Sequence, residues 1–425
     1  MEDQESLTMK PQDLRACAIS AALLAGAFGL PGSAFALTLE QALNLAEQEA
    51  PSLDAQRANL EAARSAAIPA GELPDPKLKL GLQNVPIEGE QRWRLDEDFM
   101  TMQMVGVMQD VPNRAKRRAR VESAEADVAL ADIQQTIERL KVRQNTAEAW
   151  IATFAVEQKL SLFKQLYGEN QLFLRAVTAR IAGGRGQAAD SVAPKQEAAL
   201  LAEQEDELLR NQAVARAELR RWIGNEATAP LTGTWPQWLE SFDHYQHNLH
   251  QHPDLLVFDP MTQQAEAKVR QAVAEKTPDW SWGVDYLHRG REYGDMVNLS
   301  VSFDLPLFTS SRQDPKIAAE RARLTQIEAQ RQAMLRMHNQ ELAADLAEYQ
   351  RLDRAFARVE ETLLPLAEEK VRLAMADYRA GTGELTAVID ARRQLVETRL
   401  RRIDVARDRS LSNARLHFAF GDTRP

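Results

Sequence analysis

The stretch that decides the fold is residues 280–305, WSWGVDYLHRGREYGDMVNLSVSFDL. Apolar residues alternate in it with small or polar ones on both sides of a polar loop. The apolar positions are Trp280, Trp282, Val284 and Tyr286 before the loop, and Val297, Leu299, Val301, Phe303 and Leu305 after it. A period of two is typical of a β-strand with one apolar face. The sequence therefore predicts two strands, at about 279–287 and 296–306.

The composition changes directly after the second of these strands. Residues 316–364 contain neither proline nor glycine and are rich in Ala, Leu, Glu, Gln and Arg, which favour helix. Continued to Gly381, such a helix has a length of roughly 100 Å at 1.5 Å per residue. We expect one helix at about 316–380 and a returning helix at about 384–420. A compact soluble domain, the alternative for amphipathic strands, does not use helices of this length.

The same plan is written twice along the chain. When the sequence is aligned on itself, Pro51 falls on Pro253 and Gly81 on Gly283, and near the ends Gly224 falls on Gly421. We therefore predict two repeats, 37–230 and 242–425, joined by a linker over 231–241. The elements expected in the first repeat are strands at about 77–85 and 99–111 and long helices at about 113–183 and 187–223.

Composition and charge exclude several classes of protein. The 425 residues include 52 Lys and Arg against 62 Asp and Glu, a net charge of -10, so a general nucleic-acid binder is excluded. A single cysteine excludes a disulfide scaffold. The chain carries none of the common nucleophile, phosphate-loop or metalloprotease motifs. We therefore expect no enzyme and no cofactor.

The first 36 residues have the pattern of a secretory signal peptide. Lys10 and Arg15 precede an apolar run, and Ala34-Phe35-Ala36 supplies the small residues of a cleavage site. Either Met1 or Met9 fits as the start. Cleavage after Ala36 removes the one thiol, Cys17.

Four strands pose a problem for an exported chain. In a bilayer every unpaired edge N–H and C=O is costly, so strands survive there only in a closed barrel. The smallest common barrels use eight strands, so a chain with four must pool its strands with identical copies. A periplasmic coiled-coil scaffold that never inserts is the alternative from another class, and it explains the helices without the strands.

The repeats, strand pairs and glycine turns resemble the TolC-like outer membrane efflux proteins over the whole mature chain. The most specific piece is residues 378–385, YRAGTGEL, continuing through Val388-Ile389-Asp390-Ala391 to Gly421. The resemblance implies a mainly α fold with a small membrane β part. In it, long helical hairpins form a periplasmic tunnel and four strands per chain form a twelve-strand β-barrel in a homotrimer. It further implies an exit duct in the outer membrane of a Gram-negative bacterium, joined through a periplasmic adaptor protein to an inner-membrane pump.

The resemblance also suggests where the duct is gated. Asp390 matches an aspartate that constricts the trimer, whereas a second acidic gate position falls on Ala387, so a thinner ring is expected. Asp190 and Tyr378 match a pair that links neighbouring coils by a hydrogen bond. The expected adaptor contacts are the hairpin ends, Gly183, Gly184, Arg185, Gly186, Gly381, Thr382, Gly383 and Glu384.

Two clusters contain possible metal ligands, although we expect no metal centre. His244 and His247 are spaced to share a helix face, together with His250 and His252 nearby, but a solvated helix entry fits them better. Met100, Met102, Met104 and Met108 alternate along one strand side, and thioethers suit copper(I) or silver(I). Because that side lies opposite Thr101 and Gln103, we interpret it as a lipid contact.

The substrate follows from resemblance. Residues 100–112, MTMQMVGVMQDVP, followed by Lys116-Arg117-Arg118-Ala119, are similar to the heavy-metal branch of the family, which exports cobalt, zinc and cadmium or copper and silver. That branch implies a pump of the resistance-nodulation-division type and passive conduction of metal cations. Drug efflux and type I protein secretion remain the alternatives within the family.

Overall fold

The computed structural model describes residues 36–184, 186–238 and 241–421. The predicted signal peptide therefore lies outside the described residues except for Ala36, and so does Arg185. Within the described residues the chain is mainly helical, with one four-stranded sheet, which confirms the predicted fold class. None of the helices described is long and apolar enough to cross a membrane.

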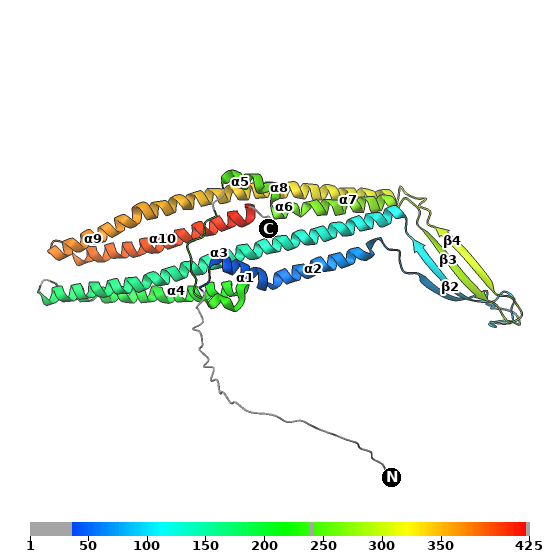
Figure 1. The fold of residues 1–425 in the computed structure, drawn as a ribbon, viewed down its shortest axis with the longest axis horizontal. Helices are drawn as coiled ribbons and strands as arrows, with labels where there is room; N and C mark the ends of the chain where they lie inside the picture. Colours follow the sequence, from blue (N-terminus) through cyan, green and yellow to red (C-terminus); the bar gives the residue numbers. More distant parts are fainter. Residues whose placement is uncertain (1–35, 185, 239–240, 422–425) are drawn as a thin grey trace, which may run out of the picture. The chain divides into compact units, whose positions relative to one another are not determined.

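The elements follow in the same order in the two halves. The first half contains α1 (Leu39–Glu49), α2 (Pro51–Ala67), β1 (Lys77–Gln83), β2 (Met102–Val111), α3 (Arg114–Ala182) and α4 (Ala193–Ile223). The second half contains α5 (Phe242–Asn248), α6 (Pro253–Leu256), α7 (Phe258–Ala274), β3 (Trp280–His288), β4 (Met296–Phe303), α8 (Gln313–Arg358), α9 (Leu364–Ala380) and α10 (Leu385–Phe420). Figure 1 shows the strands at one end of the long helices and the α3–α4 and α9–α10 turns at the other.

Two helix boundaries differ from the sequence-based expectation for reasons that involve proline. Helix α4 begins at Ala193 instead of near 187, because Pro194 occupies its first turn and a short 3-10 turn, Ala188–Ser191, precedes it. The helix expected over 316–380 is divided by a π-helical turn, Val359–Leu363, just before Pro365. Proline lacks an N–H, so the turn accommodates the lost hydrogen bond. Gly168, the equivalent position in the first repeat, leaves α3 unbroken.

The sheet joins the two halves of the chain. Its order is β1-β2-β3-β4 with every neighbouring pair antiparallel, so β2 of the first repeat pairs with β3 of the second. The register places Val107 opposite Leu78 and Val284, and Val284 opposite Leu299. Since directly paired residues point to the same side of a sheet, this row defines one face.

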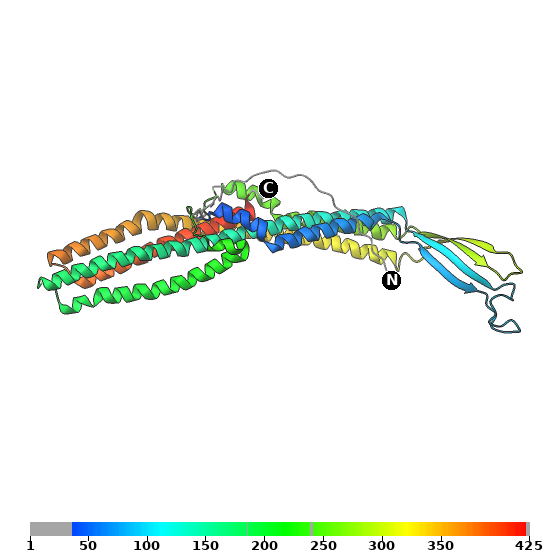
Figure 2. The same ribbon diagram turned by 60° about the horizontal axis from the view of Figure 1, so that its bottom comes forward.

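The main helical core lies where α1, α3, α4 and α10 meet. Trp150 of α3 is almost fully buried there, stacks on Phe154 with 4.9 Å between ring centroids, and donates its Nε1–H to the Leu37 carbonyl at 3.3 Å. Toward the hairpin turns, α3, α4, α9 and α10 run side by side (Figure 2), and a second cluster around Val177, Tyr378 and Val388 packs the two hairpins together. This packing fixes the position of the hairpin ends.

Candidate functional site

One face of the sheet is apolar and exposed on all four strands. Leu299 in the middle of β4 is 75% exposed, although a leucine of a soluble protein is usually buried. The face consists of Leu78, Leu80, Leu82, Val105, Val107, Trp280, Trp282, Val284, Tyr286, Val297, Leu299, Val301 and Phe303. An apolar patch that continues across four strands marks an interaction surface. Its chemistry fits the acyl chains of lipid, with the tryptophans and tyrosine suited to the membrane interface.

The opposite face is polar and more sheltered, and it corrects one sequence interpretation. Met102, Met104 and Met108 lie on this polar face, opposite Gln83, Gly81 and Lys77 in the register. Gln83 directs its amide Nε2 to the Met104 sulfur at 3.2 Å. The lipid interpretation of these methionines was therefore wrong for β2. Alternation could not assign the side because Val105 and Val107 make the other side of β2 apolar as well. Met100 precedes β2 and is exposed.

A buried carboxylate occupies the middle of the polar face. Asp285 of β3 is only 5% exposed, and its Oδ2 accepts a hydrogen bond from the Asn298 amide at 3.3 Å. Its Oδ1 has no hydrogen-bond partner among the described residues. Gly106 opposite provides the space, because a Cβ there would lie 2.0 Å from that oxygen. The polar face therefore presents both thioethers and a carboxylate, which are ligands of metal cations.

The junction between sheet and helices is fixed by Asp279, which precedes β3. Its Oδ1 accepts hydrogen bonds from the backbone N–H of Asn113 at 2.7 Å and from the Asn113 amide at 2.9 Å. Its Oδ2 contacts the Lys116 ammonium at 2.7 Å. Asn113 in turn caps α3 by accepting the Lys116 N–H. These contacts link the second repeat to the start of α3 in the first.

The hairpin ends depend on glycine. Gly381 has φ +84 after α9, and Gly184 has φ +71 after α3, a region that favours glycine. The N–H groups of Thr382 and Gly383 both donate to the Asp377 carbonyl at 3.1 Å. Most of the predicted adaptor-contact residues are exposed: Gly183, Gly184, Gly381, Thr382 and Glu384. Gly186 and Gly383 are half-buried.

The hydrogen bond expected between Tyr378 and Asp190 is not formed within the chain. The Asp190 carboxylate accepts the backbone N–H of Gln187 at 3.0 Å and so caps its own turn. Tyr378 is buried, and the Arg180 guanidinium lies 3.9 Å from the centre of its ring. Its hydroxyl has no hydrogen-bond partner among the described residues. The pKa of Tyr378 is raised above its usual value by burial and by the Asp190 carboxylate, although the Arg180 guanidinium acts in the opposite direction.

Asp390 lies on α10 with its side chain exposed, between the buried Val388 and Ala391. Farther along α10, two ion pairs connect this helix to the first hairpin. Arg392 contacts Glu197 of α4 at 3.2 Å, and Arg399 contacts Glu169 of α3 at 2.9 Å. Asp390 is therefore an exposed side chain on a helix that ion pairs attach to both helices of the first hairpin.

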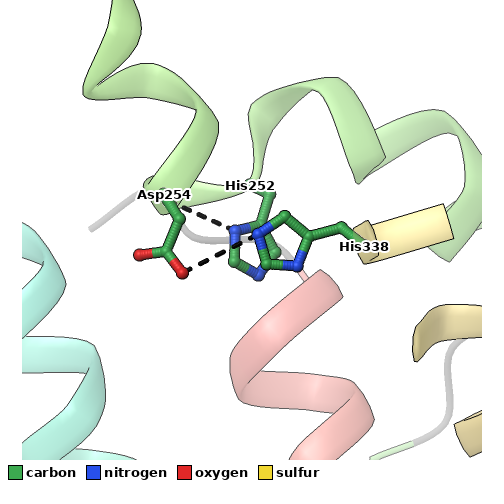
Figure 3. A group of neighbouring side chains, drawn as sticks. All are labelled: His252, Asp254 and His338. Atoms are coloured by element: carbon green, nitrogen blue, oxygen red, sulfur yellow. Dashed lines mark hydrogen bonds and ion pairs between the residues drawn. The ribbon is translucent and has the colours of Figure 1, made fainter. Parts of the chain in front are cut away.

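The histidines that the structure brings together are not the pair expected from spacing. His244 and His247 lie on α5, where the His244 Nε2 is 2.9 Å from the Asn248 amide and the His247 Nδ1 is 2.6 Å from the Asp243 carbonyl. Instead, His252 and Asp254 meet His338 of α8 (Figure 3). Sequence spacing could not find this group, because His338 is distant along the chain.

Comparison with known proteins agrees with this architecture. Residues 244–422 match the family model of outer membrane efflux proteins. The cobalt-zinc-cadmium resistance protein CzcC of Cupriavidus metallidurans is 25% identical over 392 residues, covering 87% of this chain and 86% of CzcC.

Solved structures share the fold across most of the chain. A membrane protein from Pseudomonas aeruginosa matches with a TM-score of 0.77 and 18% identity, covering 90% of this chain and 92% of that one. The outer membrane protein VceC from Vibrio cholerae matches with a TM-score of 0.73 and 20% identity, covering 90% and 96%. The chain is thus similar to the outer membrane efflux proteins over residues 244–422 and shares its fold with these solved structures over most of its length.

Proposed function

We propose that this chain forms the exit duct of a tripartite efflux system and conducts heavy-metal cations through the outer membrane. The observation that carries the proposal is the two-faced sheet at the end of the long helical hairpins, which offers a continuous apolar face to lipid and a polar face to an aqueous path. Conduction is passive, and no cofactor takes part.

The duct is proposed to be a homotrimer. The order β1-β2-β3-β4 leaves β1 and β4 as edge strands with one side unpaired. Because unpaired backbone groups are costly in a bilayer, β4 of one copy should pair with β1 of the next until the sheet closes. Three copies supply twelve strands.

The partners proposed are a periplasmic adaptor protein and an inner-membrane pump of the resistance-nodulation-division type. The hairpin ends around Gly184 and Gly381 are exposed, and a buried apolar cluster packs the two hairpins together next to them. These ends suit contact with the adaptor, while the pump selects the cargo.

The substrate class rests on two supports. The relative CzcC is named for cobalt, zinc and cadmium resistance. The polar face of the sheet also carries Met104, Met108 and the buried Asp285, whose sulfur and oxygen atoms are of the kinds that ligate metal cations.

Growth of a deletion strain tests the substrate class. The strain is grown with and without a rescuing plasmid on copper, silver, zinc, cobalt, cadmium and nickel and on a panel of dyes and antibiotics. We expect sensitivity to metals that the plasmid reverses. Reversible sensitivity confined to organic compounds would retain the duct and overturn the metal substrate.

The gate proposal predicts the behaviour of an Asp390→Ala variant. In a closed trimer three Asp390 carboxylates would face one another and narrow the path electrostatically. We expect Asp390→Ala to raise single-channel conductance and to reduce cation selectivity in planar bilayers. The control is Asp408→Ala, farther along the same helix. Unchanged currents in Asp390→Ala would remove this residue from the gate.

A further inference from the structure

Three side chains from two segments far apart in the sequence converge where α6 meets α8. His252 lies just before α6, Asp254 is in the first turn of α6, and His338 is in α8. One potential ligand atom from each lies within 4.8 Å of the other two. The two imidazole rings stack with 3.8 Å between centroids, and both are more than nine-tenths buried. Phe420 of α10 covers one side, with its ring centroid 5.3 Å from that of His252.

The hydrogen bonds around His338 orient it as metal-binding histidines are oriented. Its Nδ1 is 2.8 Å from the Glu341 carboxylate, so this nitrogen carries the proton. A carboxylate that receives one ring N–H fixes the tautomer and leaves the other nitrogen free for a metal. That other nitrogen, Nε2, is buried, has no hydrogen-bond partner among the described residues, and faces the Asp254 Oδ2 at 3.7 Å (Figure 3). In this tautomer an electron pair of the His338 Nε2 points toward the Asp254 carboxylate.

The second histidine is also available as a neutral ligand. Burial, together with the adjacent His338, lowers the pKa of His252 to about 4, although Asp254 and Glu341 act in the opposite direction. The His252 Nδ1 accepts the Asp254 N–H at 3.2 Å, a long contact that a cation could replace.

We propose that His252, His338 and Asp254 bind one borderline divalent cation of the Zn²⁺, Co²⁺ or Cd²⁺ class. Two imidazoles, one carboxylate and an open fourth position are a common zinc ligand set. Zinc–ligand bonds of about 2.0 to 2.2 Å require ligand atoms roughly 3.4 Å apart in a tetrahedron. The His338 Nε2 and the Asp254 Oδ2, at 3.7 Å, are already near that separation, and the ligand atoms of all three residues, which lie within 4.8 Å of one another, would draw together around the cation. The Asp254 side chain is 43% exposed and provides both that movement and a route from solvent.

Bound metal would join α6 to α8, and thereby the start of the second repeat to its long helix. The site lies on elements other than the hairpin ends and the sheet. The proposal therefore does not depend on which substrate the duct conducts.

Zinc binding to the purified full-length mature protein in detergent tests the proposal. The protein carries an affinity tag without histidine and is first freed of metal with a chelator. Isothermal titration with ZnCl₂ should show one tight site per chain. Asp254→Asn and His338→Ala should each weaken that site at least tenfold, as expected for loss of a ligand. His247→Ala, an exposed histidine of the same region, should leave it unchanged.

Two further measurements separate ligand loss from misfolding and from other sites. Asp254→Asn alters a partly exposed side chain, so without metal the variant protein should have the melting temperature of the wild type. Only the wild type should gain stability when Zn²⁺ is added. X-ray absorption at the zinc edge should show two imidazoles. No stoichiometric binding, binding that survives both ligand variants, or a spectrum with sulfur ligands would overturn the site.

Discussion

We expect Leu299→Arg to abolish assembly of the protein in the outer membrane. Leu299 lies in the middle of β4 and is 75% exposed on the apolar face of the sheet. An arginine facing lipid near the middle of the bilayer costs about 2 to 4 kcal/mol, and in a trimer the cost is incurred three times. The measurement is the amount of protein recovered in the outer membrane fraction after cell breakage.

The neighbouring residue provides a matched control. Ser300 follows Leu299 directly but points to the polar face, opposite Gly283. We expect Ser300→Arg to assemble at wild-type levels, because its side chain enters the aqueous path and a charged group there remains hydrated. If both variants assemble equally well, or if Ser300→Arg is the defective one, the assignment of the two faces is wrong.

The second large effect is expected at the junction of sheet and helices. Asp279→Ala removes two hydrogen bonds to Asn113 and the ion pair with Lys116. Hydrogen bonds to charged groups contribute about 1.5 to 3 kcal/mol each, and they are not additive, so we expect the free energy of unfolding to fall by roughly 2 to 4 kcal/mol. The melting temperature of the detergent-extracted protein measures the loss.

Asp304→Ala is the control for this junction. Asp304 lies at the same end of the sheet, its side chain is exposed, and its backbone N–H donates to the Asp279 carbonyl at 2.9 Å. The substitution leaves that backbone bond intact and should change the melting temperature little. An equal loss in the two variants would show that Asp279 does not hold the junction.

Much of the fold was predictable because its periodic signals are strong. The alternation from Trp280 to Leu305 fixed β3 and β4, and the stretches without proline or glycine located the long helices. Element boundaries were predicted less well, because a local turn can delay the start of a strand. Strand β2 begins at Met102 and not at 99, because the Thr101 N–H bonds back to the Asp98 carbonyl in a turn.

The candidate sites were less predictable because they depend on contacts between distant segments. Both sides of β2 are apolar, so only the register with Lys77 and Lys79 shows which side the methionines occupy. His338 is brought to His252 by packing of α6 on α8, which no local spacing reveals. The Tyr378 ring packs against the Arg180 guanidinium of the other hairpin, and no sequence motif indicates this contact.

The central claim is that the four strands of each chain close with those of identical copies in the outer membrane. Native mass spectrometry of protein extracted from purified outer membranes tests it most directly. The account predicts a particle that requires detergent for extraction and contains three copies of the chain. A single copy released by osmotic shock without detergent would contradict it and would favour a periplasmic helical scaffold.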